Sequence, residues 1–256
     1  MKKLLLLLAC FVCLSGYSQL LVNVYGTITG GMKQVSGTTL SDLKGSANGT
    51  LTNSPTANTN GFIHFVGDHG ATAGNRQCVL IATRTTFQYT NATPFTWVTI
   101  WRSTKNSANQ HNIANCQDAA ATISLTCNSR LDATNNYSTS ILRCSSAGNP
   151  LKISTSTTAY NDGMWHVEVT TFDGTGNGIM THYIDGHLIA NGTNSNFASG
   201  NLYTANSKMV LGASYSSTGS NYSYDLSGDI AVFQTANAVI TGANIADINN
   251  EFNCLQ

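Results

Sequence analysis

Short apolar runs separated by turn residues follow one another from residue 61 to the C-terminus. Runs of this length with closely spaced turn signals are typical of antiparallel β-sandwiches. The pattern predicts an all-β protein, a two-sheet antiparallel jelly-roll sandwich. Strands are expected at residues 61–66, 77–83, 95–102, 121–127, 139–144, 151–155, 164–173, 179–184, 187–190, 208–213 and 228–233.

The clearest alternation lies in the strand expected at residues 164–173. Trp165, Val167 and Val169 fall on one face, and the polar residues between them fall on the other. A period of two with one apolar face is what a half-buried strand requires. We therefore expect the two sheets to close over this apolar face, with Trp97 and Trp101 also in the core.

A tight hairpin is expected where Asp185-Gly186 separates two β-rich runs. Asp-Gly favours a two-residue turn because both of its central positions need a positive φ. This turn would place Tyr183 opposite Leu188.

One short helix is expected near the C-terminus. Ile245, Ile248 and Phe252 are spaced three and four residues apart, which is the spacing of one helical face. Thr241 precedes them and is a suitable N-cap.

The N-terminus has the pattern of an export signal. Lys2 and Lys3 precede an apolar run at residues 4–14, and small residues follow at positions 16 and 18. The run is shorter than the roughly 20 residues that span a bilayer. We expect residues 1–18 to be a signal peptide and the protein to be secreted.

Residues 19–60 differ from the rest of the chain because they are rich in Gly, Ser, Thr and Asn and contain few large apolar residues. Polar tracts of this kind are typical of linkers and loosely held arms. We therefore interpret 19–60 as an N-terminal arm or linker through which the chain could self-associate, and 61–256 as the sandwich domain.

Charge is scarce. Only 9% of residues are charged, and loss of Lys2 and Lys3 with the leader would leave ten basic residues against twelve acidic ones. Nucleic-acid binding needs clustered Lys and Arg, which this chain lacks. The composition therefore excludes a nucleic-acid partner and favours an uncharged polar partner such as a glycan.

Cysteines are the candidates for disulfides in an exported protein. Beyond the leader the chain has Cys78, Cys116, Cys127, Cys144 and Cys254, an odd number. Cys127 could pair with Cys144 across a hairpin that turns near residues 132–136, or with Cys116. The spacing alone does not choose between these pairings.

Four strand segments in order, and a terminal helical segment after them, resemble the laminin-G-like, concanavalin A-like domains. Residues 162–174 (DGMWHVEVTTFDG) are similar to that family's DG-x-WH-x-V-x-V-T-x-D-G stretch, and YIDGHL at 183–188 is similar to its Y-V-D-G-x-L hairpin. MVLGA at 209–213, SGDIAVF at 227–233 and the terminal IADI also match in order, although Ala231-Val232 replaces an Asp-Glu that is frequent in the family. The resemblance implies a jelly-roll sandwich and adhesion to glycans or proteins, often with calcium.

Hydrolysis of glycosides is disfavoured by the acidic residues. A retaining glycosidase needs two carboxylates about 5–5.5 Å apart. The only glutamates are Glu168 and Glu251, and neither has a second acid two residues away on the same strand face. A Gly-x-Ser-x-Gly nucleophile elbow is also missing from the sequence. We expect a protein that is not an enzyme, with a divergent glycosidase as the weakest alternative.

A calcium site is left open by the sequence. Calcium takes six to eight oxygen ligands, which include carboxylates and main-chain carbonyls. Asp173, in an Asp-Gly-Thr-Gly-Asn-Gly loop, and Asp225 with Asp229 are the candidate ligands. Each also has a simpler interpretation, as a turn residue or as protection of a strand edge.

Tyrosines near residue 220 are the candidates for ligand binding. Tyr215, Tyr222 and Tyr224 flank a Ser/Thr/Gly/Asn loop that also contains Asn221. Aromatic faces pack against the apolar face of a sugar ring, and amides bind its hydroxyl groups. We expect a secreted carbohydrate-binding or adhesion module that binds a glycan or glycoprotein; the alternative is a structural subunit of an extracellular fibre, matrix or virion surface.

Overall fold

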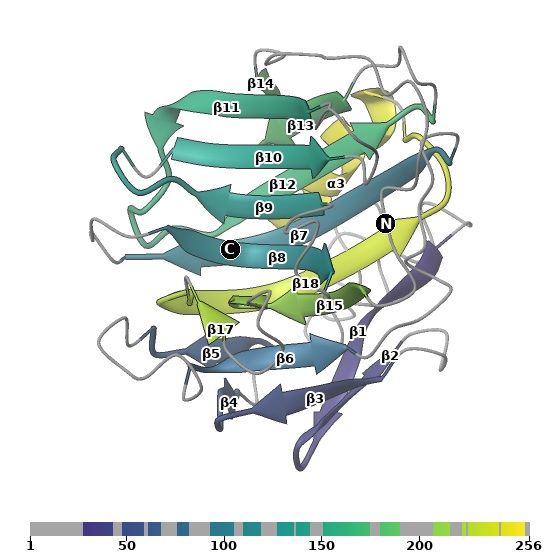
Figure 1. Ribbon diagram of the computed structural model, residues 1–256. Helices are drawn as coiled ribbons and strands as arrows, with labels where there is room; N and C mark the ends of the chain where they lie inside the picture. The colour runs from purple at the N-terminus through teal and green to yellow at the C-terminus, as the bar shows by residue number, and fades with distance from the viewer. Residues whose placement is uncertain are drawn as a thin grey trace, which may run out of the picture.

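A computed structural model describes most of the chain between residues 28 and 253 (Figure 1). The described residues are 28–42, 48–58, 61–67, 76–81, 93–104, 110–118, 127–135, 137–143, 151–174, 180–189, 207–215, 222–223, 225–240 and 242–253. The expected signal peptide and the expected N-cap Thr241 lie outside them.

Two antiparallel sheets form the molecule, and we name them sheet A and sheet B. Sheet A has the order β18-β7-β12-β13-β14, with β5 alongside β18 and β4 against β5. Its strands are β4 (Thr56–Ala57), β5 (Ile63–Phe65), β7 (Phe95–Ser103), β12 (His166–Phe172), β13 (Met180–Ile184), β14 (His187–Ile189) and β18 (Gly228–Ala236).

Sheet B has the order β2-β3-β6-β15-β8-β9-β10-β11. Its strands are β2 (Thr39–Asp42), β3 (Gly49–Thr52), β6 (Cys78–Ile81), β8 (His111–Asp118), β9 (Cys127–Leu131), β10 (Tyr137–Arg143), β11 (Leu151–Ala159) and β15 (Ser207–Leu211). β1 (Ile28–Ser36) joins the sheets because its first half pairs with β18 and its second half with β2.

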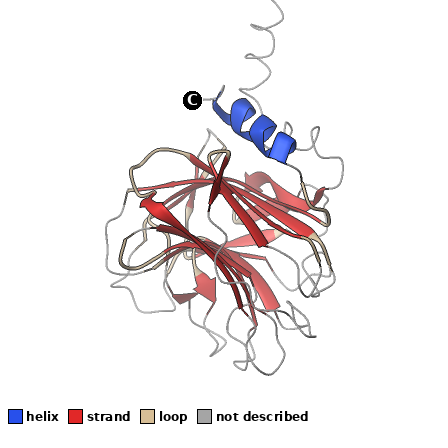
Figure 2. Ribbon diagram, turned by 90° about the horizontal axis from the view of Figure 1, so that it is seen from above, coloured by secondary structure: helices blue, strands red, loops and turns tan. Residues whose placement is uncertain are grey.

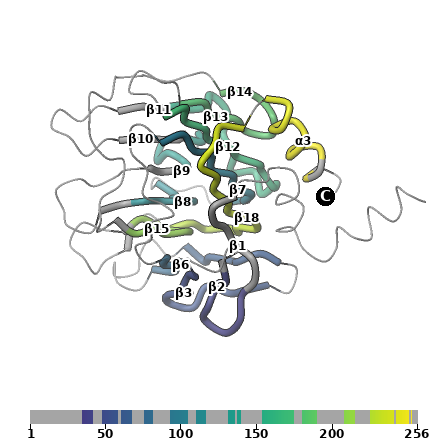
Figure 3. Tube along the Cα trace, turned by 90° about the vertical axis from the view of Figure 1, so that its right-hand side faces the viewer, coloured from purple at the N-terminus to yellow at the C-terminus, as the bar shows by residue number. Residues whose placement is uncertain are grey.

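Seen from above, the sheets are two stacked layers, and helix α3 (Gly242–Asn253) lies outside them (Figure 2). The side view places α3 on the far side of sheet A from sheet B (Figure 3). The expected β-sandwich with one C-terminal helix is confirmed. None of the described helical residues forms a segment long and apolar enough to cross a bilayer.

The main apolar core lies between the sheets. Phe65, Phe95 and Phe172 are fully buried there, together with Trp97 and Trp101, which are 2% and 0% exposed. Both tryptophans were expected in the core, and both are there.

The apolar face of β12 faces α3, which corrects the expectation that the second sheet would cover it. Val167 and Val169 pack in a separate cluster with Ile245, Ile248 and Phe252 of the helix. Trp165 is half-buried at the margin of this cluster and not in the main core. The expectation was wrong because sheet A is covered on both faces, so that burial alone does not say which face is inward.

The connection from β18 to α3 is fastened to the sheet by one hydroxyl. Thr96 Oγ1 donates to the carbonyl of Ala238 at 2.6 Å, and the N–H of Ile240 donates to Thr96 Oγ1 at 3.2 Å. These bonds bring the helix over sheet A directly after its last strand.

The interpretation of residues 19–60 as an arm is corrected for residues 28–57. This segment forms β1 to β4, and β3 lies within sheet B, between β2 and β6. Leu40 and Leu51 of the segment belong to the main core, and the partly buried Val35 packs against it. Because these strands pair within the molecule, residues 28–57 do not support self-association by strand pairing with a second copy.

The Asp185-Gly186 hairpin is confirmed together with its register. Tyr183 lies opposite Leu188, and both turn residues have positive φ, 52° and 77°. The strands expected at 61–66, 77–83, 95–102, 139–144, 151–155 and 208–213 also correspond to observed strands, with shifted ends.

Strands β8 and β9 were not expected, whereas the expected strand 121–127 lies almost entirely outside the described residues. The hairpin that turns near residues 132–136 is present between β9 and β10. The β8–β9 register sets Cys116 opposite Cys127, and Cys127 also lies opposite Leu142 of β10. Cys144 is outside the described residues, so both disulfide pairings stay predictions.

Candidate functional site

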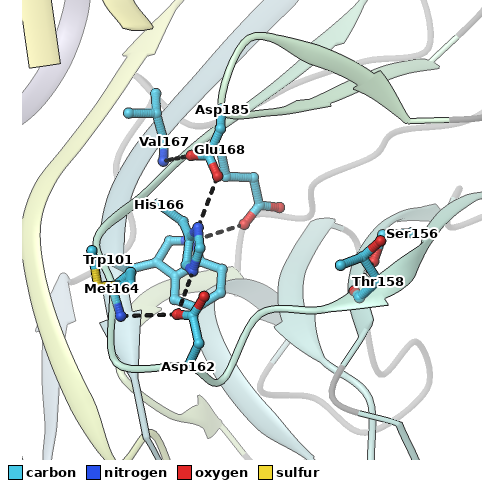
Figure 4. Close-up of polar contacts among 9 residues, drawn as sticks. All are labelled: Trp101, Ser156, Thr158, Asp162, Met164, His166, Val167, Glu168 and Asp185. Atoms are coloured by element: carbon cyan, nitrogen blue, oxygen red, sulfur yellow. Dashed lines mark hydrogen bonds and ion pairs between the residues drawn. The ribbon is translucent and has the colours of Figure 1, made fainter. Parts of the chain in front are cut away.

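A histidine clamp holds the loop that precedes β12 (Figure 4). His166 Nε2 lies 3.0 Å from Asp162 Oδ1, and His166 Nδ1 lies 2.8 Å from Asp185 Oδ2. Asp162 Oδ1 also accepts the N–H of Met164, and Asp185 Oδ1 accepts the N–H of Val167, both at 2.8 Å. The clamp joins the start of β12 to the β13–β14 turn.

Two carboxylates favour the doubly protonated imidazolium of His166. Burial alone would lower the pKa of His166, but the hydrogen bonds and charges of Asp185 and Asp162 outweigh it and raise the pKa above 6.5. Burial alone would raise the pKa of Asp162, but the Met164 N–H and His166 lower it below 3.8. Tyr160 stacks edge-on against the His166 ring at 4.9 Å, and burial followed by the charge of Asp185 raises its pKa.

A second polar group is buried between the sheets beside the clamp. Trp101 Nε1 donates to Glu168 Oε2 at 3.0 Å, and His182 Nε2 lies 3.2 Å from Glu168 Oε1. Glu168 is 1% exposed and His182 is fully buried. Buried charges persist in proteins when they are paired and hydrogen-bonded, as both oxygens of this carboxylate are.

The buried group contains a serine, a histidine and an acid without forming a catalytic relay. Ser138 Oγ lies 3.4 Å from Nε2 of His182, the same nitrogen that contacts Glu168. In a catalytic triad the serine and the acid bind opposite nitrogens of the ring. Ser138 is also fully buried, so this trio is arranged for structure and not for nucleophilic attack.

An aromatic and charged cluster lies on the outer face of sheet A, at the end of β7. The guanidinium carbon of Arg102 lies 4.7 Å from the ring centre of Trp165 and 5.3 Å from that of Phe62. Arg102 Nε donates to Asp229 Oδ2 at 2.6 Å, and His64 Nδ1 lies 2.7 Å from Asp229 Oδ1. Because the clamp fixes the loop that ends at Trp165, it also positions this cluster.

Two of the expected ligand-binding tyrosines are brought together. Tyr215 lies opposite Tyr222 in a two-stranded ladder formed by β16 (Ser214–Tyr215) and β17 (Tyr222–Ser223). β16 follows β15 and contacts β8, so the ladder belongs to the sheet B side of the molecule. Asn221 and Tyr224 lie outside the described residues.

The three candidate calcium ligands are not brought together. Asp173 follows Phe172, which lies opposite Phe95 at the start of β7. Asp229 lies in β18, opposite Arg102 near the other end of β7. β7 has nine residues, so at roughly 3.3 Å per residue the two ends are about 26 Å apart.

Asp225 and Asp229 are both buried and both near cations. Asp225 is 1% exposed, with Arg76 Nη1 at 3.8 Å from its Oδ1. Asp229 is 5% exposed and contacts Arg102 and His64. Over the described ranges, no group of three or more His, Cys, Asp or Glu side chains is arranged to hold a metal ion.

Asn115 of β8 is a buried amide on the outer face of sheet B. Its neighbours Ala114 and Cys116 belong to the core between the sheets, and Asn115 lies opposite Val210, which belongs to a small outer cluster. It is fully buried, and neither Oδ1 nor Nδ2 has a hydrogen-bond partner in the part of the chain that the structure describes. A buried amide in this state is expected to bind a water or a ligand.

The sequence contained signals for some of these groups. Asp162 and His166 are four residues apart within the DG-x-WH motif, and Asp185 is in the hairpin turn. Arg102 continues the apolar face of Val98 and Ile100, and a charge in that position was the available signal for the outer cluster. No signal in the sequence pointed to Asn115, because its unpaired amide is notable only once the fold buries it.

Comparison with known proteins gives a likeness of fold. No protein-family model matches the sequence, and no curated protein is similar to it. A binding domain of botulinum neurotoxin DC in complex with SialylT is 15% identical, with a TM-score of 0.63; the match covers 91% of this chain and 52% of that one. A botulinum neurotoxin type C structure that concerns cell entry through two ganglioside molecules is 16% identical, with a TM-score of 0.64. The match covers 92% of this chain and 53% of that one.

A Trypanosoma rangeli sialidase is similar too, with 12% identity, a TM-score of 0.64, and 90% of this chain matched to 33% of the sialidase. The chain therefore spans about half the length of the toxin domains and a third of the sialidase. The geometry and these likenesses define the class of protein by its fold: an antiparallel β-sandwich. At this level of identity the likeness establishes the fold alone.

Proposed function

We propose that this protein is an exported, non-catalytic carbohydrate-binding or adhesion module of the laminin-G-like class. Its glycan binds on the outer face of sheet B, beside the β16–β17 ladder. The toxin domains support the binding role, because SialylT and gangliosides are associated with those proteins. This chain matches only about half of each toxin domain, so the ligand of this chain is a proposal.

The observation that carries the proposal is the buried amide of Asn115. An amide offers one acceptor and two donors, and leaving them unpaired in a buried position costs about 1–3 kcal/mol. A sugar hydroxyl both donates and accepts, so it suits Oδ1 and Nδ2 together. Because Asn115 is fully buried, a bridging water connects the amide to a glycan at the surface.

The tyrosines supply the apolar half of the same site. Sugar rings pack on aromatic faces while their hydroxyl groups bind amides. Tyr215 and Tyr222 are paired in register, and Asn221 and Tyr224 are their neighbours in sequence. Calcium binding by Asp173, or by Asp225 with Asp229, is proposed separately from this glycan site, because Asp173 follows β12 and Asp229 lies in β18, both in sheet A.

The experiment is a glycan array with the intact chain and with Asn115→Leu, followed by thermal unfolding of both. Leucine keeps the branching at Cγ and removes the unpaired amide, although it is larger, so stability should stay close to that of the original chain, whereas binding should fall about tenfold. Asn112→Leu is the matched control, because that buried asparagine of the same strand has partners and its loss should destabilise.

Tyr215→Ala with Tyr222→Ala should also weaken binding, while Leu188→Ala, in the exposed β13–β14 hairpin, should not. Each measurement is repeated with a chelator to test calcium. An array without any binding would overturn the proposed function, and Asn115→Leu with unchanged binding would overturn the proposed site.

A further inference from the structure

We propose that Arg102 forms a second binding site, on the outer face of sheet A, for the carboxylate or sulfate group of an acidic polysaccharide. We name Arg102, His64, Asp229, Trp165 and Phe62 the arginine site. It lies on the opposite sheet from the site beside β16–β17 and does not depend on it.

Strand pairing places the three charged or titratable residues in a row. Asp229 of β18 lies opposite His64 of β5 on one side and opposite Arg102 of β7 on the other. Its side chain is 7% exposed, whereas those of Arg102 and His64 are 36% and 49% exposed. The carboxylate is therefore the buried base of the site, and the two nitrogen-bearing groups form its surface.

Arg102 is held in one conformation before any ligand binds. Its guanidinium lies over the rings of both Trp165 and Phe62, which contact each other edge to face at 5.6 Å. The Asp229 bond fixes Nε. An arginine loses about 2 kcal/mol of side-chain entropy when it is immobilised. Since folding has already fixed this side chain, binding an anion does not repeat that cost.

The fixed guanidinium keeps its outer donors. Nε is the one nitrogen of Arg102 with an acceptor among the described residues, so the four N–H groups of Nη1 and Nη2 have none. Two parallel N–H groups fit the two oxygens of a carboxylate or sulfate. Both oxygens of Asp229 are already used by Arg102 and His64, so an incoming anion meets donors first.

The surroundings favour a sugar acid over a simple ion. Nδ1 of His64 contacts Asp229, so Nε2 is the ring nitrogen left to hydrogen-bond a hydroxyl group, which can both donate and accept. An acid group that is flanked by hydroxyl groups thus matches both exposed residues. With only 9% charged residues in the chain, general attraction of polyanions is weak, and recognition depends on this one site.

The test is affinity electrophoresis of the intact chain through gels that contain polygalacturonate, dextran sulfate or neutral dextran. We expect retardation by at least one of the two acidic polymers, which separates carboxylate from sulfate, and none by dextran. Arg102→Gln should weaken the retardation about tenfold or more, because a hydrogen-bonded charge is lost. Arg102→Lys keeps the positive charge but lacks the two parallel N–H donors, so its retardation should lie between those of the original protein and Arg102→Gln.

Lys208→Gln is the matched control, because it removes one positive charge from sheet B and should leave the retardation unchanged. Thermal unfolding of each variant excludes loss of fold, and Arg102→Lys maintains the cation beside Asp229. The proposal is overturned if neither acidic polymer retards the protein, or if Arg102→Gln and Lys208→Gln behave alike. Asn115→Leu should bind the acidic polymers normally, so that the two sites fail independently.

Discussion

The two faces of β12 are both buried, but they are buried by different chemistry. On the outer face, Val167 and Val169 meet the isoleucines of α3. On the inner face, Glu168 lies between the sheets with Trp101 and His182. The outer contact depends on the apolar area removed from water, whereas the inner one depends on the polar contacts of a buried carboxyl group.

The difference teaches that alternation gives the period of a strand without giving the direction of its faces. A sheet covered on one side turns its apolar face inward. Sheet A has sheet B on one side and α3 on the other (Figure 3), so a polar face can lie inside if every group finds a partner. At Glu168 both carboxyl oxygens have a partner, Trp101 and His182, although Nδ1 of His182 has none among the described residues. The clamp at His166 extends the polar contacts to the surface.

The largest effect is expected on the inner face. Glu168→Ala would leave His182 and the Trp101 N–H without their acceptor, and removal of one member of a buried pair costs about 3–5 kcal/mol. Urea unfolding measures the loss. Glu168→Gln, which keeps an acceptor for Trp101, should lose clearly less. If Glu168→Ala unfolds with the free energy of the original protein, the inner face is held by packing alone.

A smaller loss is expected on the outer face. Ile248→Ala should cost about 2–3 kcal/mol, near the lower end for a buried isoleucine, because α3 lies at the surface and the site can partly close. Asp247→Ala, on the exposed side of the same helix, should stay within about 0.5 kcal/mol. Urea unfolding of both variants tests this. Equal effects of the two would mean that α3 does not stabilise sheet A.

Much of the fold was predictable where local chemistry agrees with the final contacts. The Asp185-Gly186 turn fixed the register of β13 and β14, and the spacing of Ile245, Ile248 and Phe252 predicted α3. β8 was missed because its sequence, HNIANCQD, shows no apolar alternation. Its residues 111–116 are nevertheless buried, which is a property of the surrounding strands and not of the segment.

The candidate sites were less predictable, because they combine residues from distant strands. His166 contacts Asp162, which lies only four residues away in the sequence. Its bond to Asp185, and the row formed by His64, Asp229 and Arg102, exist only after the strands pair. The contact of Arg102 with Trp165 could be predicted only by knowing that Trp165 and the valines of β12 lie on the outer face of sheet A.

The smallest effect, and the one specific to the boundary between the two faces, is the pH dependence of the clamp. The raised pKa of His166 contributes stability that is complete below its unfolded value of 6.5 and is lost as pH rises through the folded pKa. The lowered pKa of Asp162 contributes stability above 3.8 that is lost as pH falls through its folded pKa. The contribution of the clamp should therefore be level from about pH 4 to 6.5 and decline above that range. Solvent screening makes it smaller than the two effects above, because the Asp162 side chain is 53% exposed.

Urea midpoints from pH 4 to 9 measure the pH dependence of the clamp, and His166→Gln should remove the decline above pH 6.5. An identical decline in His166→Gln would assign the pH dependence to other groups and leave the clamp without an electrostatic role.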